Sequence, residues 1–186
     1  MQIALELTSA ISREEALVKG CLNEERWAQK QLYEQYFGKM MGVCVRYAGN
    51  EESARDVLNE GFIKVFKFLG RYQMGTSLEA WIKRIMVNTA IDYYRRNVRH
   101  KTEELETAFS HSVTEEDALS KCSAEEIMSC VRALPDSYRA VFNLFAIEGY
   151  NHKEVGEMLN ITESTSRSHL VKARGKLQEM LLKKKK

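Results

Sequence analysis

Polar and cationic side chains recur at helical spacing in two segments of the chain, and the clearer segment covers residues 151–170. It reads N-H-K-E-V-G-E-M-L-N-I-T-E-S-T-S-R-S-H-L. Val155 and Leu159 are spaced to face inward from a first helix, because positions four apart share one helical face. Asn160 then stands at a turn, where Gly or Asn best tolerates the left-handed backbone, and Thr162 can cap a second helix. The pattern predicts a helix-turn-helix.

The second helix of this pair would carry short polar and cationic groups on its outer face, at Thr165, Arg167, Ser168, His169 and Lys172. These side chains suit phosphates and base edges, so double-stranded DNA is the leading candidate ligand. Two positions favour the alternative of plain helix packing. Gly156 replaces the usual Ala at a cost in helix propensity of about 1 kcal/mol. Ser166 replaces an apolar residue between the helices.

The second segment, residues 78–99, would place six polar side chains near one helical face: Arg84, Asn88, Asp92, Arg95, Arg96 and Arg99. Aromatic side chains gather beside it, at Phe66, Phe68, Tyr72, Trp81, Tyr93 and Tyr94. Because guanidinium groups hold phosphates while rings stack on unpaired bases, this combination suits single-stranded nucleic acid. The alternative is that Trp81 and Tyr93 are core residues and the arginines a solvated face. Phe62 and Phe66 are assigned to the core.

The periodicity of apolar residues predicts the helices that carry these segments. Residues 14–47 should form two or three helices, broken near Asn23 and Gly38. Further helices are expected over residues 51–69, 78–99, 127–134, 138–148 and 164–182, with a loop over residues 71–77. Residues 101–122 lack apolar periodicity and are acidic, which predicts a flexible linker. The predicted fold is all-α, with helical domains over residues 1–100 and 123–186 joined by the acidic linker 101–122.

The chain of 186 residues has a net charge of only +2, but its charges are segregated. Residues 71–101 hold seven cations against two acids, a net +5, while residues 102–126 hold one cation against eight acids, a net −7. Cations dominate again from residue 163 to the end. This alternation is typical of two polyanion-binding modules around an acidic spacer. Solvated helix faces and a basic tail are the simpler alternative.

Composition disfavours several classes of protein and site. No apolar run reaches the length of a membrane span and the first residues lack a signal-peptide pattern, so we expect no membrane insertion and a cytoplasmic location. The cysteines form no C-x-x-C pair, which predicts reduced, buried thiols and no metal site at Cys21, Cys44, Cys122 and Cys130. The four histidines accompany no nucleophile motif, metal spacing or phosphate loop. We therefore expect no enzyme activity, no cofactor and no small-molecule substrate.

With both segments in view, the chain resembles a known family. The stretches A-R-D-V-L-N-E-G-F-I-K-V-F-K-F-L (54–69) and S-L-E-A-W-I-K-R-I-M-V-N-T-A-I-D-Y-Y-R-R (77–96) are similar to region 2 of bacterial RNA polymerase sigma factors. Residues 133–162 and the stretch R-S-H-L-V-K-A-R-G-K-L (167–177) are similar to region 4. The presence of these two regions alone indicates the extracytoplasmic-function (ECF) subtype. The resemblance covers about four fifths of the chain, and the paired motifs in this order are highly specific.

The resemblance implies three groups of site residues. Core polymerase would be bound by Asp56, Asn59 and Glu60, with Asn59 replacing the usual Gln. The minus-ten element would be bound by Lys64, Phe68, Tyr72, Trp81, Arg84, Asn88, Arg95 and Arg96, where an apolar floor and an amide can hold a flipped base. The minus-thirty-five element would be bound in the major groove by Thr165, Arg167, Ser168, His169 and Lys172. His169 stands where the family often has Arg, so guanine readout there is not assured.

The implied function is promoter recognition as a subunit of bacterial RNA polymerase, with core RNA polymerase and promoter DNA as partners and an anti-sigma factor as a further candidate. A linker of about 20 residues can span on the order of 70 Å when extended, enough for two lobes to reach separated DNA elements. Its acidic charge either occupies a basic polymerase channel or marks a simple solvated tether. The alternative functions are a helix-turn-helix activator that binds duplex DNA without polymerase and, more remotely, a helical enzyme.

Overall fold

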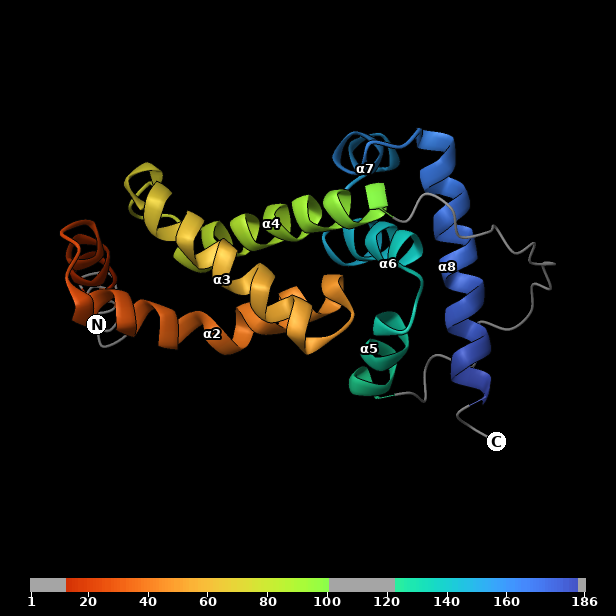
Figure 1. Cartoon of the computed structure of the whole chain (residues 1–186), viewed down its shortest axis with the longest axis horizontal. Coiled ribbons are helices and arrows are strands. Elements are labelled where there is room, and N and C mark those ends of the chain that lie inside the picture. Colours follow the sequence, from red (N-terminus) through yellow and green to blue (C-terminus); the bar gives the residue numbers. More distant parts are fainter. Residues whose placement is uncertain (1–12, 101–122, 184–186) are drawn as a thin grey trace, which may run out of the picture. The chain divides into compact units, whose positions relative to one another are not determined.

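The computed structural model describes residues 13–100 and 123–183, with residues 98–100 described as backbone only (Figure 1). The expected linker 101–122, the last lysines and the side chain of Arg99 therefore lie outside the described residues. The described chain consists of helices and turns without a strand, which confirms the all-α prediction. The chain packs as two compact units. Among the described residues, unit 1 comprises residues 13–44 and 55–89, and unit 2 comprises residues 45–54, 90–100 and 123–183.

Residues 13–100 form four described α-helices and one short 3-10 helix. The α-helices are 13–22, α2 (Arg26–Ala48), α3 (Glu51–Phe68) and α4 (Leu78–His100), and the 3-10 helix is η1 (Leu69–Arg71). The break expected near Asn23 is present, because the chain turns through Glu24 with a positive φ of 59°. The break expected at Gly38 is wrong, since α2 continues through it. A β-carbon at Gly38 would meet nothing within 4 Å, so no neighbour interrupts the helix there and glycine costs only helix propensity.

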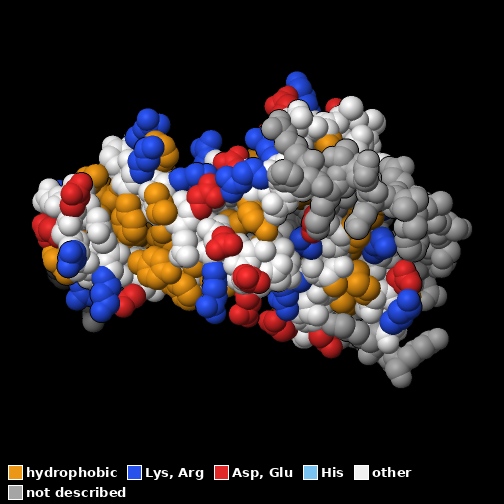
Figure 2. Space-filling view, in the orientation of Figure 1, with side chains coloured by type: hydrophobic (Ala, Val, Ile, Leu, Met, Phe, Trp, Pro, Cys, Tyr) orange, Lys and Arg blue, Asp and Glu red, His pale blue; other side chains and the backbone are white. Residues whose placement is uncertain are grey.

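The core of unit 1 is an apolar stripe from each of its helices. Its largest fully buried side chains include Leu32, Met40, Leu58, Ile82 and Met86. Helix 13–22 joins this core through Leu17, Val18 and Cys21. Other hydrophobic side chains reach the surface over α2 and α3, where Figure 2 shows them as orange patches. The most exposed of these on α3 is Ile63, at 67%.

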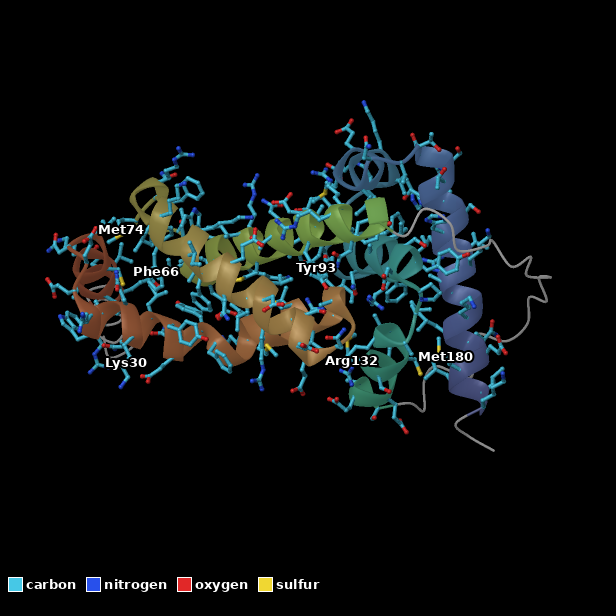
Figure 3. The ribbon with its side chains drawn as sticks, in the orientation of Figure 1. Lys30, Phe66, Met74, Tyr93, Arg132 and Met180 are labelled. Atoms are coloured by element: carbon cyan, nitrogen blue, oxygen red, sulfur yellow. The ribbon has the colours of Figure 1, made fainter. Side chains whose placement is uncertain are left out.

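The second half forms α5 (Ala124–Arg132), α6 (Asp136–Phe142), the π-helical turn η3 (Asn143–Ile147), α7 (His152–Leu159) and α8 (Glu163–Lys183). Ser123 and Glu126 make a capping box at the start of α5, which satisfies two backbone donors that a helix start leaves free. The apolar faces of α5 and α8 meet in a cluster of buried residues: Cys130, Val131, Leu134, Ala173, Leu177 and Leu181. Met180, labelled in Figure 3, packs against this cluster.

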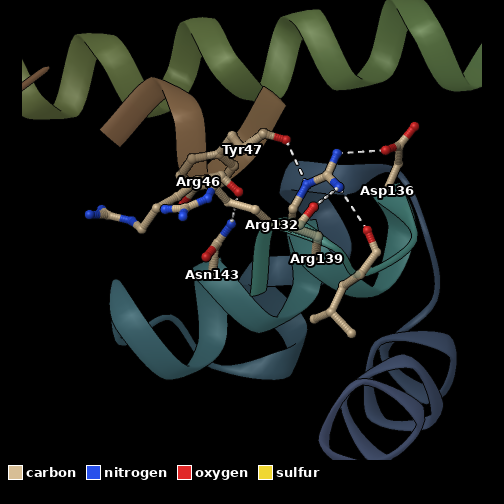
Figure 4. A network of polar contacts seen from close by, with 7 residues as sticks. Arg46, Tyr47, Arg132, Asp136, Arg139 and Asn143 are labelled. Carbon is tan, nitrogen blue, oxygen red and sulfur yellow. Dashed lines mark hydrogen bonds and ion pairs between the residues drawn. The ribbon is translucent and has the colours of Figure 1, made fainter. Parts of the chain in front are cut away.

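Unit 2 also holds a buried polar network around Arg139 of α6, which is only 5% exposed (Figure 4). Its guanidinium donates to the Tyr47 carbonyl at 3.0 Å and pairs with Asp136 at 2.6 Å. It also donates to the carbonyl oxygens of Arg132 and Leu134, at 3.0 and 2.7 Å. Asn143 is fully buried and donates to the Arg46 carbonyl at 2.8 Å. The planar fork of arginine can serve several acceptors at once, which explains how a cation is tolerated in this core.

Candidate nucleic-acid interface

The predicted helix-turn-helix is present in α7 and α8. Asn151 caps α7 by accepting from the Glu154 backbone N–H at 3.0 Å, and the Glu154 carboxylate accepts from the Asn151 N–H at 2.8 Å. Asn160 ends α7 in the left-handed conformation, with φ 58° and ψ 45°. An asparagine tolerates this region better than most residues, so the expectation for the turn is confirmed.

Gly156 has a packing reason that the sequence did not reveal. A β-carbon on Gly156 would lie 2.8 Å from the carbonyl oxygen of Ile161, a backbone atom of the turn. The Ile161 N–H in turn donates to the Gly156 carbonyl at 3.0 Å. The chain thus returns close to α7 directly after the turn, and the cost of glycine in a helix is offset by this close approach.

Ser166, the second unusual position, lies fully buried in α8 facing α7. Its hydroxyl oxygen is 3.0 Å from Nδ1 of His152, the first residue of α7. Phe145 of η3 stacks on the His152 ring, with centroids 4.3 Å apart. The polar group between the helices is therefore paired, and a paired buried hydroxyl avoids the desolvation penalty that an unpaired one would bring.

The second helix, α8, begins at a Thr162 cap, whose hydroxyl accepts from the Thr165 N–H at 3.1 Å. Among the five predicted duplex-binding residues, Arg167 and Ser168 are exposed. Arg167 also pairs with Glu163, one turn earlier, at 2.5 Å. This face is open to a ligand, and an exposed ion pair of this kind is easily exchanged for a phosphate.

The other three predicted residues, Thr165, His169 and Lys172, are half-buried. The His169 ring meets Tyr138 of α6 edge to face at 5.2 Å, and the Lys172 ammonium lies 5.9 Å from the centre of the same ring. Arg174, which is not in the predicted set, is also exposed. Its spacing of seven from Arg167 places both cations on one face of the helix.

The predicted polymerase-binding residues lie on α3. Asp56 and Asn59 are exposed, while Glu60 is half-buried and pairs with Lys64 at 3.0 Å. Ile63 follows Asp56 by seven positions and Asn59 by four, so it shares their face. Ile63 therefore places an exposed apolar side chain among the polar residues of this face.

The predicted minus-ten residues are spread over the end of α3, the following loop and α4. Phe68 is half-buried, with the Arg71 guanidinium 4.8 Å and the Lys67 ammonium 5.6 Å from its ring centre. Tyr72 is buried at 7% exposure, and its ring lies 5.7 Å from the half-buried Trp81. Lys67 and Arg71 are not in the predicted set, and the sequence alone does not show that both cations lie near the Phe68 ring.

Along α4 the exposed predicted residues are Arg84, Asn88, Arg95 and Arg96. Trp81, Arg84 and Asn88 follow one another at spacings of three and four and share one face, and cationic side chains gather along one edge of α4 in Figure 2. Phe62 is buried at 3%, which confirms its assignment to the core. Phe66 is only half-buried, with its ring centroid 6.3 Å from that of Phe62, so its full assignment to the core is wrong.

Other expectations concern thiols, metals and membranes. Among the described residues, Cys21, Cys44 and Cys130 are buried cysteines that take part in no disulfide, as expected, and Cys122 lies outside the described residues. Among residues 13–100 and 123–183, no group of three or more His, Cys, Asp or Glu side chains is arranged to hold a metal ion. No described helix is both long and apolar enough to cross a membrane.

Comparison with known proteins gives two family matches, sigma-70 region 2 over residues 32–100 and sigma-70 region 4 over residues 124–177. The ECF RNA polymerase sigma factor SigE of Mycolicibacterium smegmatis is 29% identical over 158 residues, covering 82% of this chain and 61% of that protein. RNA polymerase sigma factor SigZ of Bacillus subtilis is 29% identical over 154 residues, covering 82% of this chain and 86% of that protein. The solved structure of sigma factor RpoE in complex with the anti-sigma factor NepR from Bartonella quintana aligns with a TM-score of 0.48 at 18% identity, covering 82% of this chain and 95% of that one.

Proposed function

The chain belongs to the sigma-70 family of RNA polymerase sigma factors, in its ECF subtype, and from this premise we propose that it directs core RNA polymerase to specific promoters and helps to open them. Polymerase supplies the chemistry, and this chain makes and breaks no bond. Its place of work is then the cytoplasm, with core RNA polymerase and promoter DNA as its partners. Family membership makes an anti-sigma protein a further candidate partner.

The observation that carries the proposal is the occurrence of region 2 and region 4 in this order on one chain. Region 4 would read the minus-thirty-five element by placing α8 in the major groove, as second helices of helix-turn-helix pairs do. The exposure of Arg167 and Ser168 supports direct contact with DNA. For Thr165, His169 and Lys172 we propose contact at the edge of the groove, because Tyr138 already covers part of the last two side chains.

For the minus-ten element we propose that region 2 captures bases after the strands separate. Trp81 offers an aromatic surface beside the exposed Arg84 and Asn88, and ring, cation and amide are what a flipped base and its phosphate require. The DNA backbone beside these bases would be held by cationic side chains. These are the two cations at the Phe68 ring, and also Lys64, Arg95 and Arg96. Tyr72 is buried and therefore calls for a role other than direct contact with DNA.

For core polymerase we propose docking on the face of α3 that carries Asp56, Asn59, Glu60 and Ile63. The exposed apolar Ile63 among carboxylates and an amide gives this face an anchor with a polar surround, which is the usual composition of a protein contact. We retain the division into a region 2 domain over residues 1–100, a linker over residues 101–122 and a region 4 domain over residues 123–186 as part of the proposal.

The decisive experiment reconstitutes the purified chain with sigma-free core polymerase and maps the transcripts initiated on genomic DNA. We expect initiation at a restricted set of sites that share two sequence elements, and none from core polymerase alone. Electrophoretic shift with and without core polymerase separates this function from that of an activator. Tight binding to duplex DNA by the chain alone, with no selective initiation after reconstitution, would favour the activator and overturn the proposal.

A further inference from the structure

A residue outside the matched region 2 segment reaches the loop that follows η1. Glu14 lies on helix 13–22, ahead of the family match that begins at residue 32. Its Oε1 atom is 2.9 Å from the hydroxyl oxygen of Tyr72, 58 positions later. The same hydroxyl lies 2.5 Å from the Thr76 carbonyl. A phenol has one hydrogen to donate, so a carboxylate and a backbone carbonyl share it at one partly buried point.

Helix 13–22 holds Glu14 firmly, because one face of the helix is built into the core. Leu17, Val18 and Cys21 are 5%, 2% and 6% exposed. At Gly20 a β-carbon would lie 2.7 Å from the Ala28 side chain, so the start of α2 passes close against this helix. The carboxylate is therefore presented by a packed element rather than by a free end.

Hydrogen bonds within the loop 72–77 and to the Tyr72 hydroxyl order this loop. Thr76 donates its hydroxyl to the Gln73 carbonyl at 2.7 Å, and its N–H bonds the same oxygen at 3.2 Å. Gly75, with φ +85°, supplies the positive φ that this tight turn needs. Gln73 and Met74 point outward and are exposed, and Met74 is labelled in Figure 3. The Tyr72 hydroxyl thus binds the Thr76 carbonyl on the inner side of the loop, while the Gln73 and Met74 side chains face solvent.

The Tyr72 hydroxyl remains protonated in this environment. Burial raises its pKa above the ordinary value for tyrosine, and the hydrogen bond to Glu14 raises the pKa further. The neighbouring Tyr36 has its pKa raised to about 12, by burial first and by the Glu14 charge second. The raised pKa values keep both phenols neutral across the physiological range of pH, and Tyr72 donates to the carboxylate.

We infer that Glu14 is a positioning residue for promoter opening. Its carboxylate fixes the Tyr72 side chain, and Tyr72 in turn keeps the loop 72–77 in the conformation that binds unpaired bases. Tyr72 then serves as an internal support of the loop, and the exposed side chains around it make the contact with DNA. A loop that is ordered before the DNA arrives does not lose that freedom on binding. The inference rests on the proposed function, and it extends the minus-ten machinery to a helix ahead of the matched segment.

The test compares Glu14→Ala, Glu14→Gln and Tyr72→Phe in the full chain bound to core polymerase, with Glu15→Ala as the matched control. Opening is followed by the fluorescence of 2-aminopurine placed in the minus-ten element. We expect Glu14→Ala and Tyr72→Phe each to slow opening by about tenfold, the effect of losing one hydrogen bond to a charged group. Glu14→Gln should retain most of the rate, because its amide oxygen still accepts, and the double variant should be no slower than the slower single variant.

A second measurement needs no promoter. Hydrogen exchange in the free chain should become faster at the amides of residues 73–77 in Glu14→Ala and stay unchanged at residues 81–87 of α4. Wild-type exchange and wild-type opening in Glu14→Ala would overturn the inference, as would equal losses of opening, core binding and duplex binding. Failure of the wild-type chain to open any promoter, with the exchange result as expected, would instead refute the proposed function and leave the Glu14 support in place.

Discussion

Replacement of Arg139 by methionine is the sharpest test of the buried network in unit 2. Arg139 is 5% exposed and its guanidinium makes four hydrogen bonds, three to backbone carbonyls and one to the Asp136 carboxylate. Methionine has a similar length and can occupy the same channel without a donor. The variant therefore leaves three backbone carbonyl groups and the Asp136 carboxylate without the guanidinium donor.

The magnitude follows from these bonds and from the charge that is removed with them. Hydrogen bonds to charged groups contribute about 1.5–3 kcal/mol each, but the buried cation also carries a desolvation cost that the variant no longer bears. Breaking a buried pair by removing one partner costs about 3–5 kcal/mol, and we expect a loss in this range. With about 4–8 °C per kcal/mol for a unit of this size, the melting temperature of unit 2 should fall by more than about 12 °C.

The assay can separate the two units because both tryptophans, Trp27 and Trp81, lie in unit 1. Tryptophan fluorescence then follows the unfolding of unit 1, while far-ultraviolet circular dichroism follows all helices. The matched control is Arg167→Met, which removes an exposed ion pair with Glu163 and should cost no more than about 0.5 kcal/mol. If Arg139→Met destabilises the chain no more than this control does, the network contributes no stability and the reasoning is wrong.

Three further predictions concern the proposed DNA contacts and the helix-turn-helix. Arg167→Ala should weaken minus-thirty-five binding by about 1–3 kcal/mol without changing affinity for core polymerase, and a loss of core binding would contradict it. Asn88→Ala should relax base preference at one unpaired minus-ten position in selection from randomised promoters, whereas an unaltered preference would remove Asn88 from the site. Burial first, and the Arg167 charge second, lower the pKa of His152. The imidazole of His152 is therefore protonated more readily in the unfolded chain than in the folded one. Its contribution to the free energy of unfolding is complete above about pH 6.5 and is lost as the pH falls from that value toward the folded-state pKa. His152→Gln should flatten this decline in urea titrations, and an unchanged slope would show that other groups cause it.

Much of the fold follows from local patterns. The helices expected over residues 51–69 and 78–99 correspond closely to α3 and α4, because apolar spacing and flanking turn residues act within a few positions. Asn160 was identified as the turn residue for the same reason, and its φ of 58° agrees. The break expected at Gly38 failed, since glycine weakens a helix without ending it unless something else competes for the backbone.

At the candidate site, the surroundings of several residues depend on partners that the sequence does not reveal. Gly156 and Ser166 weakened the prediction of a helix-turn-helix, yet the first permits close approach of the Ile161 carbonyl and the second is paired with His152. Tyr72, a predicted minus-ten residue, is buried and its hydroxyl bonds the Glu14 carboxylate. In each case the deciding partner lies on another element, and its distance could not be read from spacing along one helix.

Residue order alone determined that this chain is helical, where its main helices lie and which segments could meet nucleic acid, because periodicity, caps and turn residues act over one or two turns. Tertiary structure decided which polar side chains turn inward. Arg139 reaches a carbonyl 92 positions away and Tyr72 a carboxylate 58 positions away. Whether a charged or hydroxyl group is buried depends on finding such a distant partner, since an unpaired polar group inside a protein is costly.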